Sequence, residues 1–188
     1  MIFFLIIVFT FIYSIDLNQW NNTKSILSPN KLIKNDNFLY GSTPGGLFIY
    51  DTINQNFSKE YMPNFCNELV QFNQSDNGDF WFLCENGILY NNSNLMINYL
   101  DIDKAIDFII QNQSIFILYE NENISGIIRL NFTDDEIFFE DYYEGFTLNY
   151  DTKFVSITII DSKLFLLTDE GFYYGDVNDN LKFASNWT

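Results

Sequence analysis

Apolar and polar positions along the chain form a pattern that occurs four times. In each copy an apolar run ends at polar or small residues, turns at glycine or asparagine, and resumes as an aromatic and aliphatic run. The four copies are Asn37–Thr52, Gly78–Asn92, Ser114–Phe132 and Lys163–Val177. Two apolar runs joined by a short turn of this composition predict a β-hairpin in each copy.

Three of the four copies carry a glycine at the same place in the turn, at Gly46, Gly87 and Gly171. We expect a positive φ there, which residues with a Cβ tolerate poorly. The first strand of each hairpin is nearly all apolar, in Phe38–Tyr40, Phe80–Leu83, Ile115–Leu118 and Leu164–Leu167. A continuous apolar run of this length predicts a strand that is covered on both faces.

Each hairpin has a further strand candidate on either side. The upstream candidates are Lys31–Lys34, Leu69–Phe72, Ile106–Ile110 and Val155–Ile160. The downstream candidates are Asn56–Tyr61, Met96–Leu100, Glu136–Tyr143 and Leu181–Trp187. Four strands in a repeat of roughly 40–45 residues are typical of a β-propeller blade, which buries its two faces by stacking on its neighbours. We therefore predict an all-β fold with about four propeller blades and little helix, Ile102–Gln111 being the one segment of ambiguous pattern.

Three segments carry a resemblance to known propellers. Leu39–Asp51 and Thr168–Trp187 resemble the first propeller of PorZ-type proteins. Gly78–Tyr90 is similar to the blade motif of the wider class of two-component-regulator propellers, with Cys84 where threonine is usual. The resemblance extends over about residues 17–188. It implies that these blades belong to a larger ring of roughly six to eight blades, with a complete four-bladed unit as the alternative.

Met1–Ser14 is a short unbroken apolar segment, followed directly by polar residues. Its length fits the apolar core of a signal peptide better than a bilayer span of about 20 residues. We predict a signal peptide at 1–15 and a partial propeller at 16–188; a buried first strand and an uncleaved anchor are the alternatives. The polar segment Asp16–Thr23 is a candidate strand for completing a blade. The expected location is periplasmic or at the cell surface.

The net charge of −16, with only nine basic residues, makes nucleic acid and anionic membrane surfaces poor partners. The chain has no histidine, which excludes histidine-based triads and most zinc chemistry. Carboxylates remain for acid and base catalysis, but they fall mostly in turns, where Asp bonds the nearby backbone. We therefore predict no catalytic residue, no cofactor and no enzymatic activity, with a fragment of a carbohydrate-active enzyme as the alternative.

Cys66 and Cys84 are the only cysteines. In an exported protein they could form a disulfide. However, Cys84 ends an apolar strand at the place that Thr168 holds in the last copy, which favours a buried free thiol. Metal binding by two cysteines without histidine is a poor fit to known zinc sites.

Two acidic segments were weighed as calcium sites. The densest run extends from Asp134 to Glu144 and alternates with aromatic residues. A calcium site needs several oxygens that converge, and we favour a solvated edge strand whose charges discourage edge-to-edge pairing. Asp176–Asn180 resembles the start of a calcium loop, but Leu181 stands where glycine is required, so we predict a hairpin turn. Calcium is an alternative that the sequence does not support.

Four aromatic residues, Trp81, Tyr90, Tyr173 and Tyr174, are candidates for a binding face at the mouth of the propeller. Their strand positions favour the core instead. We expect the protein to hold a protein or glycan partner at a propeller face as a non-enzymatic scaffold. The PorZ-type resemblance implies a role in bacterial type IX secretion and surface attachment. A ligand-sensing extracytoplasmic propeller of a two-component regulator is the alternative function.

Overall fold

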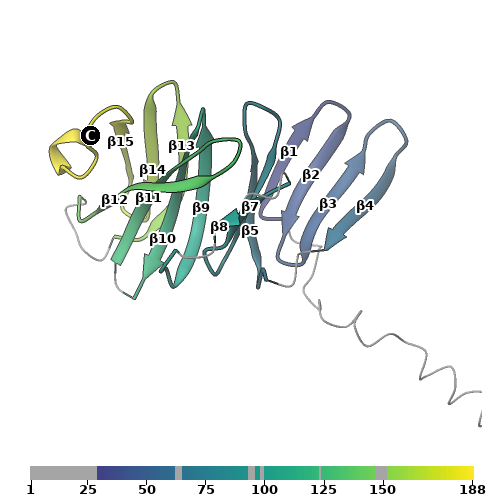
Figure 1. The fold of residues 1–188 in the computed structure, drawn as a ribbon, viewed down its shortest axis with the longest axis horizontal. Helices are drawn as coiled ribbons and strands as arrows, with labels where there is room; N and C mark the ends of the chain where they lie inside the picture. The colour runs from purple at the N-terminus through teal and green to yellow at the C-terminus, as the bar shows by residue number, and fades with distance from the viewer. Residues whose placement is uncertain (1–28, 62–64, 93–95, 98–99, 123, 147–151) are drawn as a thin grey trace, which may run out of the picture.

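The computed structural model describes residues 29–61, 65–92, 96–97, 100–122, 124–146 and 152–188. These residues form four antiparallel sheets that lie side by side in chain order (Figure 1). Within each sheet the strands also follow chain order, so every sheet is a simple meander. The all-β prediction is confirmed, and we number the sheets as blades one to four along the chain.

The predicted inner and upstream strands are confirmed in all four blades. Blade one consists of β1 (Lys31–Asn35), β2 (Phe38–Thr43), β3 (Gly46–Asp51) and β4 (Asn56–Tyr61). Blade two consists of β5 (Leu69–Gln74), β6 (Phe80–Cys84), β7 (Leu89–Asn91) and β8 (Met96–Ile97). Blade three consists of β9 (Lys104–Gln111), β10 (Ser114–Asn121), β11 (Ile124–Phe132) and β12 (Ile137–Glu144). Blade four consists of β13 (Phe154–Ile160), β14 (Lys163–Thr168) and β15 (Phe172–Asp176).

The turns between the second and third strands follow the predicted glycine pattern. Gly46, Gly87 and Gly171 have φ values of 136°, 78° and 149°. Thr43 and Thr168 close the turns of blades one and four, because each hydroxyl donates to the carbonyl of the glycine three residues later, at 2.7 and 3.0 Å. The repeated sequence pattern therefore encodes a repeated turn geometry.

The predicted outer strand of blade four, Leu181–Trp187, is wrong. The chain there forms turns and a short 3-10 helix, η2 (Ala184–Asn186). The side chain of Asp176 accepts a hydrogen bond from the backbone of Asn178 at 2.9 Å, and Asn180 accepts one from the backbone of Lys182 at 3.1 Å. Such local bonds compete with an extended strand and turn the chain.

Apolar residues of this turning segment still pack against blade four. Leu181 is fully buried, and the indole N–H of Trp187 donates to its carbonyl at 2.8 Å. A Cβ on Gly175 would lie only 2.5 Å from the Leu181 side chain, so glycine is required beneath it. The segment therefore supplies to the core what an outer strand would have supplied.

Two clusters of buried apolar side chains lie between the blades. One joins blades two and three, and includes Trp81, Phe108 and Ile117. The other joins blades three and four, and includes Leu118 and Leu166. Because β10 contributes to both clusters, it is covered on both faces, as its apolar run predicts.

The signal peptide predicted at 1–15 and the candidate strand Asp16–Thr23 lie outside the described residues. Within the described part of the chain, no helix is long and apolar enough to cross a membrane. Ile102–Gln111, the segment of ambiguous pattern, belongs largely to strand β9. The number of blades in a complete ring stays a prediction.

Candidate functional site at the axial end of the blades

The first strand of each blade borders the first strand of the next, so β1, β5, β9 and β13 form the inner side of the arc. Each of these strands is hydrogen-bonded to only one neighbour within its own sheet. The other backbone edge needs partners from elsewhere. Side-chain amides and carboxylates supply them across each of the three seams between blades.

Asp107 of β9 bridges the seam between blades three and four. Its carboxylate accepts a hydrogen bond from the Ser156 hydroxyl at 2.6 Å and one from the backbone N–H of Ile157 at 3.0 Å. Asp107 is almost fully buried. A buried carboxylate persists where several donors satisfy it, so this residue positions β13 beside β9.

Amide side chains of β5 bridge the other two seams. Gln71 and Asn73 both donate to the carbonyl of Phe108, at 2.7 and 2.8 Å, and so join blades two and three. Lys31 of blade one donates to the Asn73 side chain at 3.4 Å. Burial lowers the pKa of Lys31, while the negative charge of Asp107 acts in the opposite direction. The inner side of the arc is therefore a polar layer.

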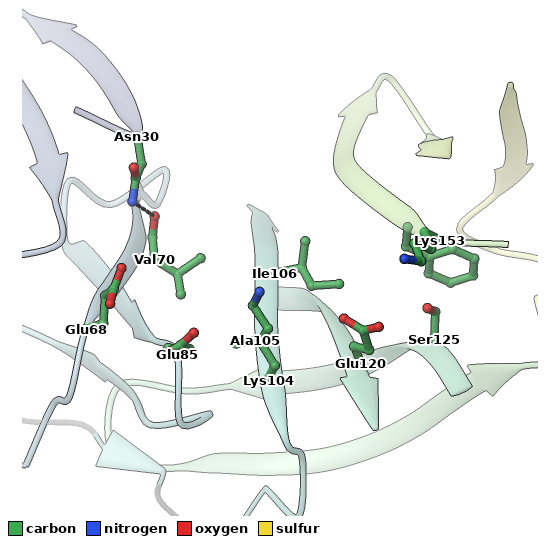
Figure 2. A pocket seen from close by; sticks show the side chains of 11 residues that line it. Asn30, Glu68, Val70, Glu85, Lys104, Ala105, Ile106, Glu120, Ser125 and Lys153 are labelled. Carbon is green, nitrogen blue, oxygen red and sulfur yellow. Dashed lines mark hydrogen bonds between the residues drawn. The ribbon is translucent and has the colours of Figure 1, made fainter. Parts of the chain in front are cut away.

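A pocket of about 310 Å³ opens at one end of this layer, and we call it the axial pocket (Figure 2). It lies where the first strands begin and the second strands end, and each blade contributes to it. Its charged residues are two lysines and three glutamates, which are Lys104, Lys153, Glu68, Glu85 and Glu120. Its other lining residues are Asn30, Val70, Ala105, Ile106, Ser125 and Phe154.

The rim of the axial pocket is held by bonds between each entering chain segment and a turn of the same blade. In blade two, the backbone N–H of Glu85 donates to the carbonyl of Glu68 at 2.8 Å. In blade four, Lys153 donates its backbone N–H to the Asp169 carboxylate at 2.9 Å, and the N–H of Asp169 returns a bond to the Lys153 carbonyl at 3.0 Å. The lining residues are therefore fixed by backbone geometry.

The axial pocket offers both ammonium donors and carboxylate acceptors. In the view of Figure 2, Lys104 lies between Glu85 and Glu120, and Lys104 and Glu120 are cross-strand partners in the β9–β10 register. Such a mouth suits a ligand that presents hydroxyl, amide or mixed charged groups. Ser125 is the one hydroxyl side chain that lines it.

The four aromatic candidates do not form a common face. Trp81 is fully buried, with its ring 4.7 Å from that of Phe132. Tyr90 stacks on Phe82 at 5.0 Å, and burial raises its pKa to about 12. Tyr173 packs against the core of blades three and four. Tyr174 lies on the other face of blade four, beneath the Lys163 ammonium group. Their strand positions thus favoured the core for a sound reason.

The acidic run from Asp134 to Glu144 forms the end of blade three, mostly in β12, which is an edge strand as expected. Two of its charges are paired with cations: Glu140 with Arg129 at 2.9 Å, and Asp141 with Lys182 at 2.6 Å. Among the described residues, no three His, Cys, Asp or Glu side chains gather as a metal site. Asp176 begins a turn, but that turn leads into η2 and not into the second strand of a hairpin.

Cys66 and Cys84 form a disulfide, with 5.5 Å between their Cα atoms. The prediction of a buried free thiol is therefore wrong. The β5–β6 register places Leu69 opposite Cys84, and the segment that enters β5 brings Cys66 close to it. Cys84 does occupy the position of Thr168, but it closes its turn region by a covalent bond where Thr168 uses a hydrogen bond.

The polar layer and the axial pocket were missed from the sequence. A usable signal was present, because Gln71, Asn73 and Asp107 interrupt strands that are otherwise largely apolar. Polar residues at such positions indicate an edge that needs hydrogen-bond partners. The pocket carried a weaker signal, since its residues are scattered over all four repeats.

Comparison with known proteins places the fold among β-propellers. No protein-family model and no curated protein matches the chain. Among solved structures, PorZ, a surface component of the type IX secretion system of Porphyromonas gingivalis, is 13% identical with a TM-score of 0.58. The alignment covers 89% of this chain but only 23% of PorZ.

Two other structures show the same fold. The extracellular domain of BT4673, a putative one-component system of Bacteroides thetaiotaomicron, is 14% identical with a TM-score of 0.53, and 76% of this chain covers 20% of it. The computationally designed protein Ika4 is 8% identical with a TM-score of 0.54, and 82% of this chain covers 94% of it. At these identities the likeness concerns the fold, and it confirms the expected propeller class, with PorZ among its members.

Proposed function

We propose that this protein is a non-enzymatic recognition module that holds a protein or glycan partner in the axial pocket. The observation that carries the proposal is the pocket itself, where all four blades contribute to one mixed-charge opening. Two lysines and three glutamates provide donors and acceptors for hydroxyl, amide and charged groups. The chain has no histidine to act as a general base.

The proposed location is outside the cytoplasm, in the periplasm or at the cell surface. The apolar segment at Met1–Ser14 supports export. The Cys66–Cys84 disulfide supports it as well, because disulfides persist mainly in oxidising compartments. The net charge of −16 disfavours nucleic acid and anionic membranes as partners. The likeness to PorZ motivates a specific version of the proposal, in which the partner belongs to type IX secretion and surface attachment.

Binding to glycan and peptide arrays tests the proposal. The full chain is compared with a variant in which Lys104 and Lys153 are both replaced by alanine. Lys34→Ala is the matched control, because Lys34 is an exposed lysine on the opposite face of blade one. We expect the pocket variant to lose about tenfold or more in affinity, a loss typical of removing anchoring contacts, and the control to bind as the wild type does. Equal binding by the pocket variant, or hydrolysis of a bound glycan, would contradict the proposal.

A ligand-sensing role is the second candidate, and it is motivated by the likeness to the BT4673 extracellular domain. In that case the axial pocket would hold a small ligand such as an oligosaccharide. The gene sequence after Thr188 separates the two functions. A transmembrane helix followed by a signalling domain supports the sensor, whereas further blades followed by a surface-attachment domain support the scaffold.

A further inference from the structure

The two ends of the arc expose apolar sheet faces that correspond to faces buried inside it. Blade one uses the Tyr40 side of its sheet to contact blade two, where the Tyr40 ring lies 4.7 Å from that of Phe80. Alternate residues of a strand point to opposite faces. Leu32, Phe48 and Phe57 therefore lie on the face of blade one that points away from blade two, and we call it the leading face.

The leading face is an aromatic surface. The ring of Phe48 covers Gly41, where a Cβ would lie 2.0 Å from it. The ring of Phe57 lies 4.6 Å from that of Tyr50 and 6.3 Å from that of Phe48. Even so, Phe57 is 74% exposed and Leu32 is 52% exposed. Exposed apolar surface of this kind marks an interaction site in a soluble protein.

Blade four has the matching face at the other end of the arc. Leu164 and Leu166 point into the core shared with blade three. Phe165 and Leu167 alternate with them and lie on the opposite face, which we call the trailing face. It carries an apolar groove of about 320 Å³, whose lining includes Ile160, Phe165, Leu167 and Phe172. Phe172 is 66% exposed, and Ile160 is 58% exposed.

We infer that the occupant of the trailing face is the leading face of a second copy of this chain. Inside the chain, each blade meets the next through a trailing face of one and a leading face of the other, so contact between copies continues an interface that already exists three times. The same ends of the blades then meet. Lys34, beside the β1–β2 turn, and Asp161, in the β13–β14 turn, come from matching ends and carry opposite charges.

Two copies joined in this way at both ends form a closed ring of eight blades, within the usual range of about four to eight. Both apolar faces are then covered in each copy. The polar layer of β1, β5, β9 and β13 also acquires its missing half, because the inner strands of the second copy face it. The axial site is therefore completed by the partner copy, and this assembly goes beyond the proposed recognition role.

Sedimentation and light scattering of the exported full chain test the ring without any ligand. We expect the mass of two chains. Phe57→Lys on the leading face and Leu167→Glu on the trailing face should each raise the dissociation constant by about tenfold or more, as expected for a charge placed in an apolar interface. Phe139→Lys is the control, because Phe139 is 48% exposed on β12 and lies on neither face. It should leave the mass unchanged.

A mixture of the Phe57→Lys and Leu167→Glu proteins provides the decisive test. In a closed ring of the two variants, one contact pairs lysine with glutamate and the other contact is wild type, so the dimer should return. Circular dichroism and thermal melting show whether each variant keeps its fold. The inference is overturned by a single-chain mass at all concentrations, by growth beyond two chains, or by dimers that both substitutions leave unchanged.

Discussion

Leu118 of blade three and Leu167 of blade four hold the same position in the repeat, but their surroundings differ. Leu118 is fully buried, whereas Leu167 is 49% exposed. The reason is the place of each blade in the arc, since β10 lies between two blades and β14 has a neighbour on one side. In a repeat fold of this kind, a residue contributes to stability in proportion to what the adjacent repeat places against it.

The largest expected effect comes from truncating these two leucines. Leu118→Ala should lower the free energy of unfolding by about 2–5 kcal/mol, because it leaves a cavity in a closed core. Leu167→Ala should cost less than about 1 kcal/mol in the monomer, because its side chain is half in solvent. Urea unfolding at a concentration where the protein is monomeric measures both. Equal losses would show that the two blades are packed alike, against the comparison made above.

The second prediction compares how the corresponding turns of blades two and four are closed. Replacing Cys66 and Cys84 together by alanine should lower the free energy of unfolding by about 3 kcal/mol, as expected for a loop of this size; the cysteines are 18 residues apart. Thr168→Ala removes one hydrogen bond to Gly171 and should cost about 1 kcal/mol.

Thermal or urea unfolding with and without a reducing agent measures the two effects. Reduction should destabilise the wild type and Thr168→Ala to the same extent, and should leave the double alanine variant unaffected. If the double variant is as stable as the oxidised wild type, the covalent link contributes nothing and the two turns are equivalent.

The smallest effect concerns the tyrosines of the covered blades. Burial raises the pKa of Tyr90 to about 12, from an ordinary value of 10.0. The folded state therefore favours the neutral phenol. The stabilisation from this group is complete below pH 10 and is lost as the pH rises from 10 through about 12. Absorbance at 295 nm during an alkaline titration follows phenol ionisation, and Tyr90→Phe should remove a late part of the curve. Loss of signal near pH 10 instead would show an exposed phenol.

The repeat itself was predictable because both of its signals are local. The apolar runs set the positions of β2, β6, β10 and β14, and the recurring turn glycines set the hairpins between these strands and the next. The outer strand of blade four was not predictable from apolar content alone. Leu181 and Trp187 are buried as they would be in a strand, but Asp176 and Asn180 redirect the backbone between β15 and η2.

Long-range partners were harder to read from the chain. The pairing of Cys66 with Cys84 depends on the path of the segment that enters β5, which the apolar pattern does not specify. The axial pocket combines residues from Asn30 to Phe154, and only the stacking of the blades brings them together. Asp107 could have been noticed as a carboxylate within an apolar strand, although its partners on β13 lie about fifty positions further along.

Coverage of β10 on both faces has a consequence for how the protein opens. Local unfolding should begin at the two ends of the arc, where each sheet has one neighbour, and should reach β10 last. Amide hydrogens of β10 are then the slowest to exchange with solvent, and those of β4 and β15 are among the fastest. Because Lys104 and Glu120 belong to the blade that opens last, the centre of the axial pocket keeps its shape while the margins of the molecule fluctuate.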